Sequence, residues 1–136
     1  MKYLFDTDIL SNLMKRNPSP ALIERLKDLP FQLQYTSSIT VGELYYGAFR
    51  TPHSQVIIKK IEEVFPFLCG ILPFDEKPAR EYGRIRAELE TKGESLAEPD
   101  IRIAAISLVN DATLVTGNIK HFKRIKGLRV ENWFEG

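Results

Sequence analysis

Residues 1–8 are MKYLFDTD, and this stretch decides the fold that the sequence predicts. Residues 3–5 form an apolar run of β-favouring side chains, which is typical of a strand buried on both faces. The run stops at Asp6, and residues 9–14 then carry apolar side chains at helical spacing. A carboxylate at such a junction lies at the carboxyl edge of an open α/β sheet, where these folds bind ligands.

The rest of the chain continues the alternation of strands and helices. Beyond the first pair, the pattern predicts helices near 18–29, 40–50, 54–65, 76–90 and 99–109, and strands near 31–35, 70–74, 112–116 and 128–131. Residues 120–125 are expected to form a short basic helical turn. The sequence therefore predicts one α/β domain, residues 1–136, with a mostly parallel sheet.

Composition limits the possible partners and location. The 136 residues carry a net charge of +1, so a nucleic acid has to be held by a local basic patch. The single cysteine, Cys69, excludes an internal disulfide and a thiolate metal cluster, and its apolar surroundings predict a buried thiol. Acids at the N-terminus argue against a secretory signal, and the apolar segment 64–74 is too short and broken to span a bilayer. We expect a cytoplasmic protein without a membrane partner.

Three acids near strand ends or helix starts are the candidate metal ligands: Asp6, Glu43 and Asp100. Each has an ordinary structural explanation, because Asp caps helices and acids near a helix start are favoured by the macrodipole. As a set they indicate a hard cation, Mg²⁺ or Mn²⁺, since there is no His or Cys group to favour zinc. Three carboxylates packed together without a cation would repel one another.

Other polar residues give weaker signals. Thr116 and Asn118 follow the strand expected beside the first one, and they serve either a turn or the orientation of metal-bound water. Basic side chains cluster in two places and are either a solvated surface or phosphate contacts; the candidate substrate contacts are Arg86, Lys120, Lys123 and Arg124.

The helix near 40–50 has almost no polar face apart from Glu43. Such a helix is either buried or covered by a partner. In a domain of this size we expect a partner to cover part of it, through Leu44, Tyr45, Tyr46 and Phe49.

In the order and spacing of these motifs, the sequence resembles the PIN-domain ribonucleases, specifically the VapC toxins of bacterial and archaeal toxin–antitoxin modules. The likeness extends over essentially the whole chain. The matching stretches are LFDTD (4–8), SSITVGELYYG (37–47), residues 83–93, PDIRIAA (99–105), LVTGN (114–118) with Phe122, and GLRVENW (127–133).

The resemblance implies a PIN-like three-layer α/β/α sandwich with about five strands. It also implies a Mg²⁺- or Mn²⁺-dependent endoribonuclease in which metal-activated water attacks the phosphodiester in line. Asp6, Glu43 and Asp100 match the metal-binding acids of the family. Thr116 and Asn118 occupy the last motif, where many members carry a fourth Asp, so a second metal is in question. Asp8 stands where many relatives have Asn.

Two partners are implied as well. The family forms homodimers and is inhibited by a VapB-type antitoxin whose tail lies across the active-site groove. We therefore expect the 40–50 helix to line that groove through the four side chains named above.

Two rival interpretations remain open. Asp6-Thr7-Asp8 after a strand is also similar to the start of haloacid-dehalogenase-type phosphatases, although Leu10 and the missing downstream acidic pair fit poorly. The other rival is a PIN-like module that binds RNA or protein without catalysis.

Overall fold

The computed structural model describes residues 1–135. Its sheet has five parallel strands in the order β3-β2-β1-β4-β5. The central strand β1 (Lys2–Phe5) lies between β2 (Gln34–Ser37) and β4 (Ala112–Val115), and β3 (Gly70–Leu72) and β5 (Val130–Glu131) form the edges. The predicted parallel sheet of about five strands is confirmed.

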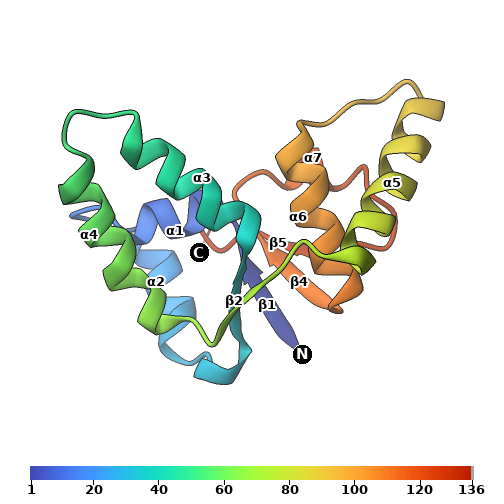
Figure 1. Cartoon of the computed structure of the whole chain (residues 1–136). Helices are drawn as coiled ribbons and strands as arrows, with labels where there is room; N and C mark the ends of the chain where they lie inside the picture. Colours follow the sequence, from blue (N-terminus) through green and yellow to red (C-terminus); the bar gives the residue numbers. More distant parts are fainter. Residues whose placement is uncertain (136) are drawn as a thin grey trace.

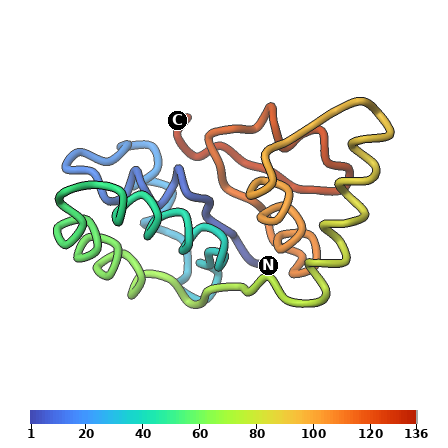
Figure 2. Tube along the Cα trace, turned by 45° about the horizontal axis from the view of Figure 1, so that its top comes forward, coloured from blue at the N-terminus to red at the C-terminus, as the bar shows by residue number. Residues whose placement is uncertain are grey.

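Helices cover both faces of this sheet, so the chain is the expected three-layer sandwich (Figures 1 and 2). Because parallel strands need crossover connections, most of the helices lie between successive strands. One layer holds α1 (Thr7–Leu13), α2 (Pro20–Lys27), α3 (Ser38–Phe49) and α4 (Ser54–Val64); the other holds α5 (Glu76–Thr91), α6 (Glu98–Val109) and α7 (Ile119–Phe122). Short 3₁₀ turns at Phe31–Leu33 and Phe65–Phe67 complete the described elements.

The first strand explains why the core has two halves. Side chains alternate across a strand, so Leu4 packs against α5 and α6, whereas Phe5 packs against α1, α3 and the C-terminal Trp133. Both are essentially inaccessible to solvent, at 0% and 1% exposure. Burial on both faces is what the uninterrupted apolar run predicts, and it fixes the place of Asp6 at the end of the strand.

Two local predictions were wrong. The strand expected at residues 31–35 begins three residues later, because Pro30 starts a 3₁₀ turn and the hydroxyl residues Thr36 and Ser37 belong to β2. Thr36 can be buried there because its hydroxyl donates a 2.7 Å hydrogen bond to the carbonyl of Phe5. Cys69 is exposed rather than buried, since it lies just before the edge strand β3.

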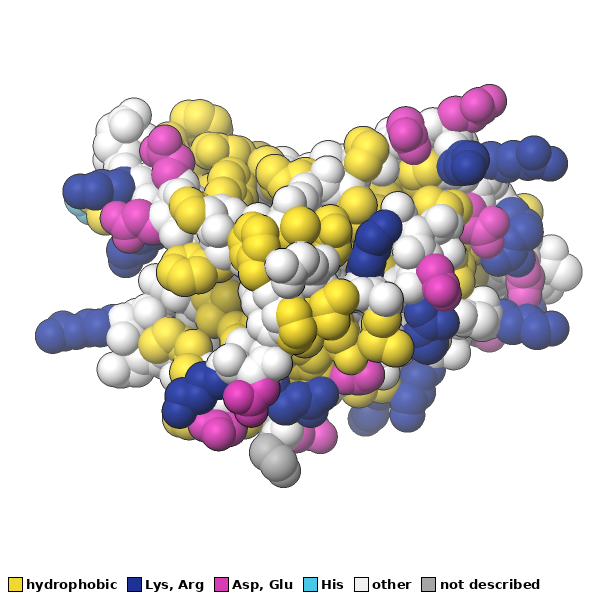
Figure 3. Space-filling model, turned by 90° about the horizontal axis from the view of Figure 1, so that it is seen from below, with side chains coloured by type: hydrophobic (Ala, Val, Ile, Leu, Met, Phe, Trp, Pro, Cys, Tyr) yellow, Lys and Arg dark blue, Asp and Glu magenta, His cyan; other side chains and the backbone are white. Residues whose placement is uncertain are grey.

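Charged side chains are spread widely on the surface. Figure 3 shows the face at the amino-terminal edge of the strands, where apolar side chains occupy the centre and most Lys and Arg side chains lie around the rim. Among residues 1–135, none of the helices combines the length and apolarity needed to cross a bilayer.

Candidate metal centre

Asp6 lies where β1 passes into α1, at the carboxyl edge of the sheet. Its backbone N–H donates to the carbonyl of Val115, and its carboxylate accepts from the N–H of Ile9 at 3.1 Å as the N-cap of α1. The side chain is only 6% exposed. Burial raises its pKa to about 7, and the charges of Asp8 and Asp100 push in the same direction against hydrogen bonds from Thr116 and Ile9.

Asp100 and Glu43 approach this site from two other helices. Asp100 lies in the first turn of α6, and its pKa is raised by burial and then by the charge of Glu43, while nearby His121 opposes the rise. Glu43 lies on α3, which packs against α6. Asp100 is therefore an electrostatic neighbour of both Asp6 and Glu43 at this edge of the sheet.

Thr7 also takes part in the site, although it was not among the predicted site residues. The Thr7 hydroxyl donates to Glu43 Oε1 at 2.5 Å and lies 3.4 Å from the hydroxyl of Thr40, which in turn contacts Ser37 at 3.3 Å. This chain of hydroxyl groups joins the start of α1 to the start of α3. Thr7 therefore holds the Glu43 carboxylate in one orientation, and the only sequence signal for this role is a hydroxyl residue directly after Asp6.

We expect Thr7→Val to weaken Mn²⁺ binding by roughly 10-fold, the lower end of the range for partners that orient metal ligands. Valine keeps the shape of threonine but cannot donate to Glu43. Isothermal titration with Mn²⁺ measures the affinity, and Thr7→Ser, which keeps the hydroxyl, serves as the matched control. An unchanged affinity in Thr7→Val would show that Glu43 does not depend on this hydrogen bond.

Thr116 and Asn118 also lie at the site. The buried hydroxyl of Thr116 bonds the Asp6 carboxylate and accepts the N–H of Asn118 at 3.0 Å. The amide nitrogen of Asn118 lies 3.5 Å from Oδ2 of Asp8. Although residue 118 is neutral, a fourth carboxylate is therefore present beside it, contributed by Asp8 from the start of α1.

The donor set suits a hard cation. All candidate ligands are oxygen atoms, and none of the four acids forms an ion pair with Lys or Arg within the described chain. Among residues 1–135, however, no three Asp, Glu, His or Cys side chains converge into a closed ligand set. Mg²⁺ is commonly held by one or two carboxylates and several waters, so such an open arrangement fits it better than it fits zinc.

The basic candidates divide into two groups. Arg86 is paired with Glu90 and bonded to Tyr82, and Arg124 donates to the carbonyl of Ser95, so both guanidinium groups are already engaged. Lys120 and Lys123 are exposed on and just after α7, and their neighbour His121 is close enough to influence Asp100. The two lysines thus remain exposed on the segment that carries His121, whereas the two arginines stabilise local structure.

The four apolar candidates on α3 do not share one environment. Leu44 is buried in the core at 6% exposure, so its side chain is not available to a partner, and the prediction is corrected for this residue. Its position follows from the inward face of the helix. Tyr45 is partly buried and stacks on Phe49 at 6.1 Å between ring centroids. Tyr46 and Phe49 are 67% and 66% exposed.

Comparison with known proteins identifies the family of this chain. The family model described as PIN domain matches residues 3–128. Ribonuclease VapC2 from Haemophilus influenzae (strain ATCC 51907 / DSM 11121 / KW20 / Rd) is 38% identical over 98% of each chain. The chain belongs to the VapC group of the PIN-domain family.

Two further relatives extend the comparison. The tRNA(fMet)-specific endonuclease VapC of Shigella flexneri is 32% identical over 98% of both chains. The crystal structure of DNA-bound VapBC from Salmonella typhimurium contains a chain that is 32% identical and superimposes with a TM-score of 0.89, again over 98% of both chains. Membership of the family therefore rests on the whole domain and on the same fold.

Proposed function

We propose that this protein is a metal-dependent endoribonuclease and the toxin of a VapBC-type module, acting on cytoplasmic RNA. The observation that carries the proposal is the burial of Asp6 at the carboxyl edge of the sheet, with Asp8 and Asp100 close to it and Glu43 close to Asp100. A buried carboxylate without a basic partner is costly, and a bound dication would compensate for that cost. The names of the Haemophilus and Shigella relatives support RNA as the substrate.

Asp6, Glu43 and Asp100 would hold Mg²⁺ or Mn²⁺, and Asp8 supplies a fourth negative charge where the neutral Asn118 does not. When bound, the ion polarises a phosphoryl oxygen and lowers the pKa of a coordinated water. Thr116 and Asn118 orient donors and acceptors around Asp6 and Asp8. The exposed Lys120 and Lys123 are placed to attract the phosphates of the strand.

The rival interpretations have less support. A haloacid-dehalogenase-type phosphatase does not agree with the PIN-domain match, which spans residues 3–128. A binding module without catalysis would have no need to keep four carboxylates as neighbours at a cost in stability.

The direct test is cleavage of labelled RNA by the purified chain with Mg²⁺ or Mn²⁺, with EDTA as the metal-free arm. We expect cutting only with the ion. RNA binding without cutting would favour the binding module, and hydrolysis of small phosphoesters would favour the phosphatase. Sequencing the cut ends would then identify the RNA target.

We also propose a VapB-type antitoxin and a second copy of this chain as protein partners. The support for the antitoxin is the likeness to a VapBC structure together with two apolar features. The first feature is Phe49, which is exposed on α3. The second is an apolar hollow of about 400 Å³ among α1, α2 and the 65–68 segment, with a lining that includes Leu10, Leu13, Ile23, Leu26 and Phe67.

Analytical ultracentrifugation of the chain alone tests the homodimer.

We expect Phe49→Asp to weaken binding of the co-expressed antitoxin by about 30-fold or more, because exposed aromatic anchors commonly contribute 2 kcal/mol or more to an interface. Val109→Asp, a change at an exposed position at the end of α6, is the matched control. Surface plasmon resonance with immobilised antitoxin measures both variants. Equal loss in the two would mean that the added charge, not the α3 face, causes the effect.

A further inference from the structure

A groove of about 490 Å³ runs from the candidate metal centre between α3 and α6. Its lining includes Gly42, Glu43 and Tyr46 from α3, and Glu98, Pro99 and Arg102 from α6. Glu43 thus belongs both to the acid cluster and to the wall of the groove. A volume of this size lies within the range of small-ligand sites and is sufficient for one nucleobase.

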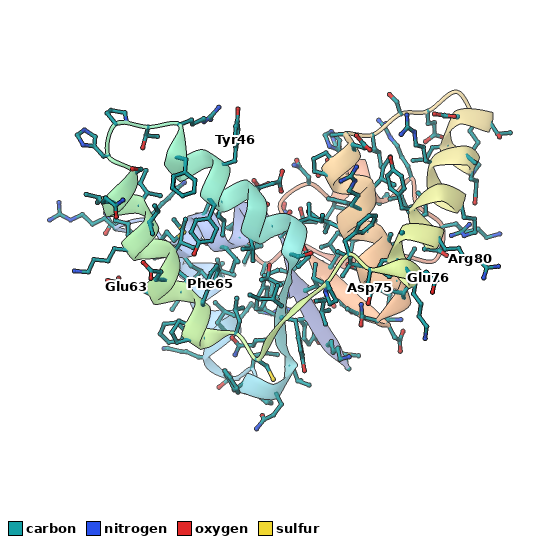
Figure 4. All side chains as sticks on the ribbon, in the orientation of Figure 1. Tyr46, Glu63, Phe65, Asp75, Glu76 and Arg80 are labelled. Carbon is teal, nitrogen blue, oxygen red and sulfur yellow. The ribbon has the colours of Figure 1, made fainter. Side chains whose placement is uncertain are left out.

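The rim of this groove carries an exposed aromatic ring. Tyr46 projects outward from α3 in Figure 4, and 67% of the residue is accessible. The Arg50 guanidinium lies 5.4 Å from the ring centroid, which leaves the ring open to stacking on its other side. Nothing lies within 4 Å of a Cβ atom placed at Gly42, one helical turn before Tyr46, so the groove is open there.

The opposite wall carries a carboxylate in a fixed position. The Tyr82 hydroxyl and the Arg102 guanidinium both donate to Glu98 Oε1 at 2.7 Å. Arg102 is itself held over the rings of Phe74 and Tyr82, at 5.4 and 5.5 Å from their centroids. Within residues 1–135, Glu98 Oε2 accepts no hydrogen bond, so one acceptor atom remains available in the wall.

The charges favour a neutral, flat ligand over a cationic one. Arg102 compensates Glu98. Glu43 is bonded to Thr7 and, under the proposed function, is committed to the metal ion. An exposed aromatic ring and a free acceptor in one groove, beside a cluster of acids, suit an unstacked base of a single strand.

We propose that this groove binds one base of the RNA strand next to the phosphate at the acid cluster, stacked on Tyr46 and recognised by Glu98. This rests on the function proposed above. A carboxylate oxygen accepts a hydrogen bond from the N4 amino group of cytosine but repels the O4 carbonyl of uracil. With the free oxygen of Glu98 facing the 4-position of the base, and not the N3–H that uracil could also donate, the groove selects cytosine over uracil.

The test uses two fluorescent eight-nucleotide RNAs, oligo(C) and oligo(U), whose affinities are measured by anisotropy with Ca²⁺ as the ion. Homopolymers place the same base in the groove in every register. We expect the wild-type chain to bind oligo(C) about 10-fold more tightly than oligo(U). Glu98→Gln turns the free acceptor into an amide that can donate, so we expect it to remove or reverse this preference.

Stacking is tested separately. We expect Tyr46→Ala to weaken binding of both RNAs about 10-fold, whereas Tyr46→Phe keeps the ring and changes affinity less than about twofold. Phe31→Ala removes an aromatic ring that is 49% exposed before β2 and controls for a general loss of apolar surface.

Each outcome decides the proposal. Equal affinity of the wild type for the two RNAs, no binding of either, or an unchanged affinity in Tyr46→Ala overturns the base-binding groove. If the chain nevertheless cuts a mixed RNA with Mg²⁺, the proposed nuclease function stands and only the groove fails. A base preference without cutting supports the groove and counts against catalysis.

Discussion

Asp6→Asn lowers the rate of metal-dependent RNA cleavage by about 10³-fold or more if the proposed centre is correct. The variant keeps an oxygen that can accept the Ile9 N–H, so the N-cap of α1 survives. It loses the charge of the most deeply buried acid of the site, one of the three proposed metal ligands. Metal assistance contributes several kcal/mol to such a reaction, and each 1.36 kcal/mol corresponds to a factor of ten.

The measurement is the initial rate of cleavage over a range of Mg²⁺ concentrations, with circular dichroism to show that the variant is folded. Asp28→Asn, an exposed carboxylate after the last residue of α2, is the matched control and retains the wild-type rate. Full activity in Asp6→Asn would exclude Asp6 as a metal ligand. A rate restored by high Mg²⁺ would instead indicate that the other acids hold the ion with reduced affinity.

The part of this site that the sequence predicts is the part with local signatures. A buried strand that ends in Asp6 specifies its own position, because the apolar run places β1 in the middle of the sheet. The helices predicted at 40–50 and 99–109 begin within two residues of those bounds, because Ser37 caps α3 and Pro99 lies in the first turn of α6. Since these element ends meet at one edge of a parallel sheet, the grouping of the acids follows from topology.

What the sequence could not predict depends on contacts between distant residues. The bond from Thr7 to Glu43 joins residues that are 36 positions apart, and a hydroxyl residue after Asp6 does not by itself identify Glu43 as its partner. The proximity of Asp8 and Asn118 spans 110 positions. Leu44 and Tyr46 are only two positions apart, yet one lies in the core and the other in solvent, because the packing of α3 decides which side faces inward.

The basic clusters show a different limit. Charge runs predict an exposed basic surface but not whether each charge is free. Arg86 and Arg124 have local partners in the fold, which removes them as obvious phosphate contacts. Lys120 and Lys123 form no ion pair within the described chain, and they lie on and just after α7, which follows β4 directly.

The same Asp6→Asn change is expected to stabilise the metal-free protein at pH 8, in EDTA, by roughly 2–4 kcal/mol. Burial raises the pKa of Asp6 to about 7 in the folded chain, about three units above the value of an exposed Asp. Between about pH 4 and pH 7 the folded state therefore holds a proton that the unfolded state has lost. The free energy of unfolding contributed by this group falls as pH rises through that window.

Asparagine does not titrate, so the stability difference between variant and wild type should be small near pH 4 and reach its full size above pH 7. Urea unfolding at a series of pH values measures this difference, and the curve for Asp28→Asn should run parallel to that of the wild type. Added Mg²⁺ should stabilise the wild type through binding to the folded state and leave Asp6→Asn nearly unaffected. A metal ligand is expected to destabilise the fold when the ion is absent and to be necessary for stabilisation by the ion. If Asp6→Asn instead destabilised the chain at pH 8 in EDTA, Asp6 would have a purely structural role.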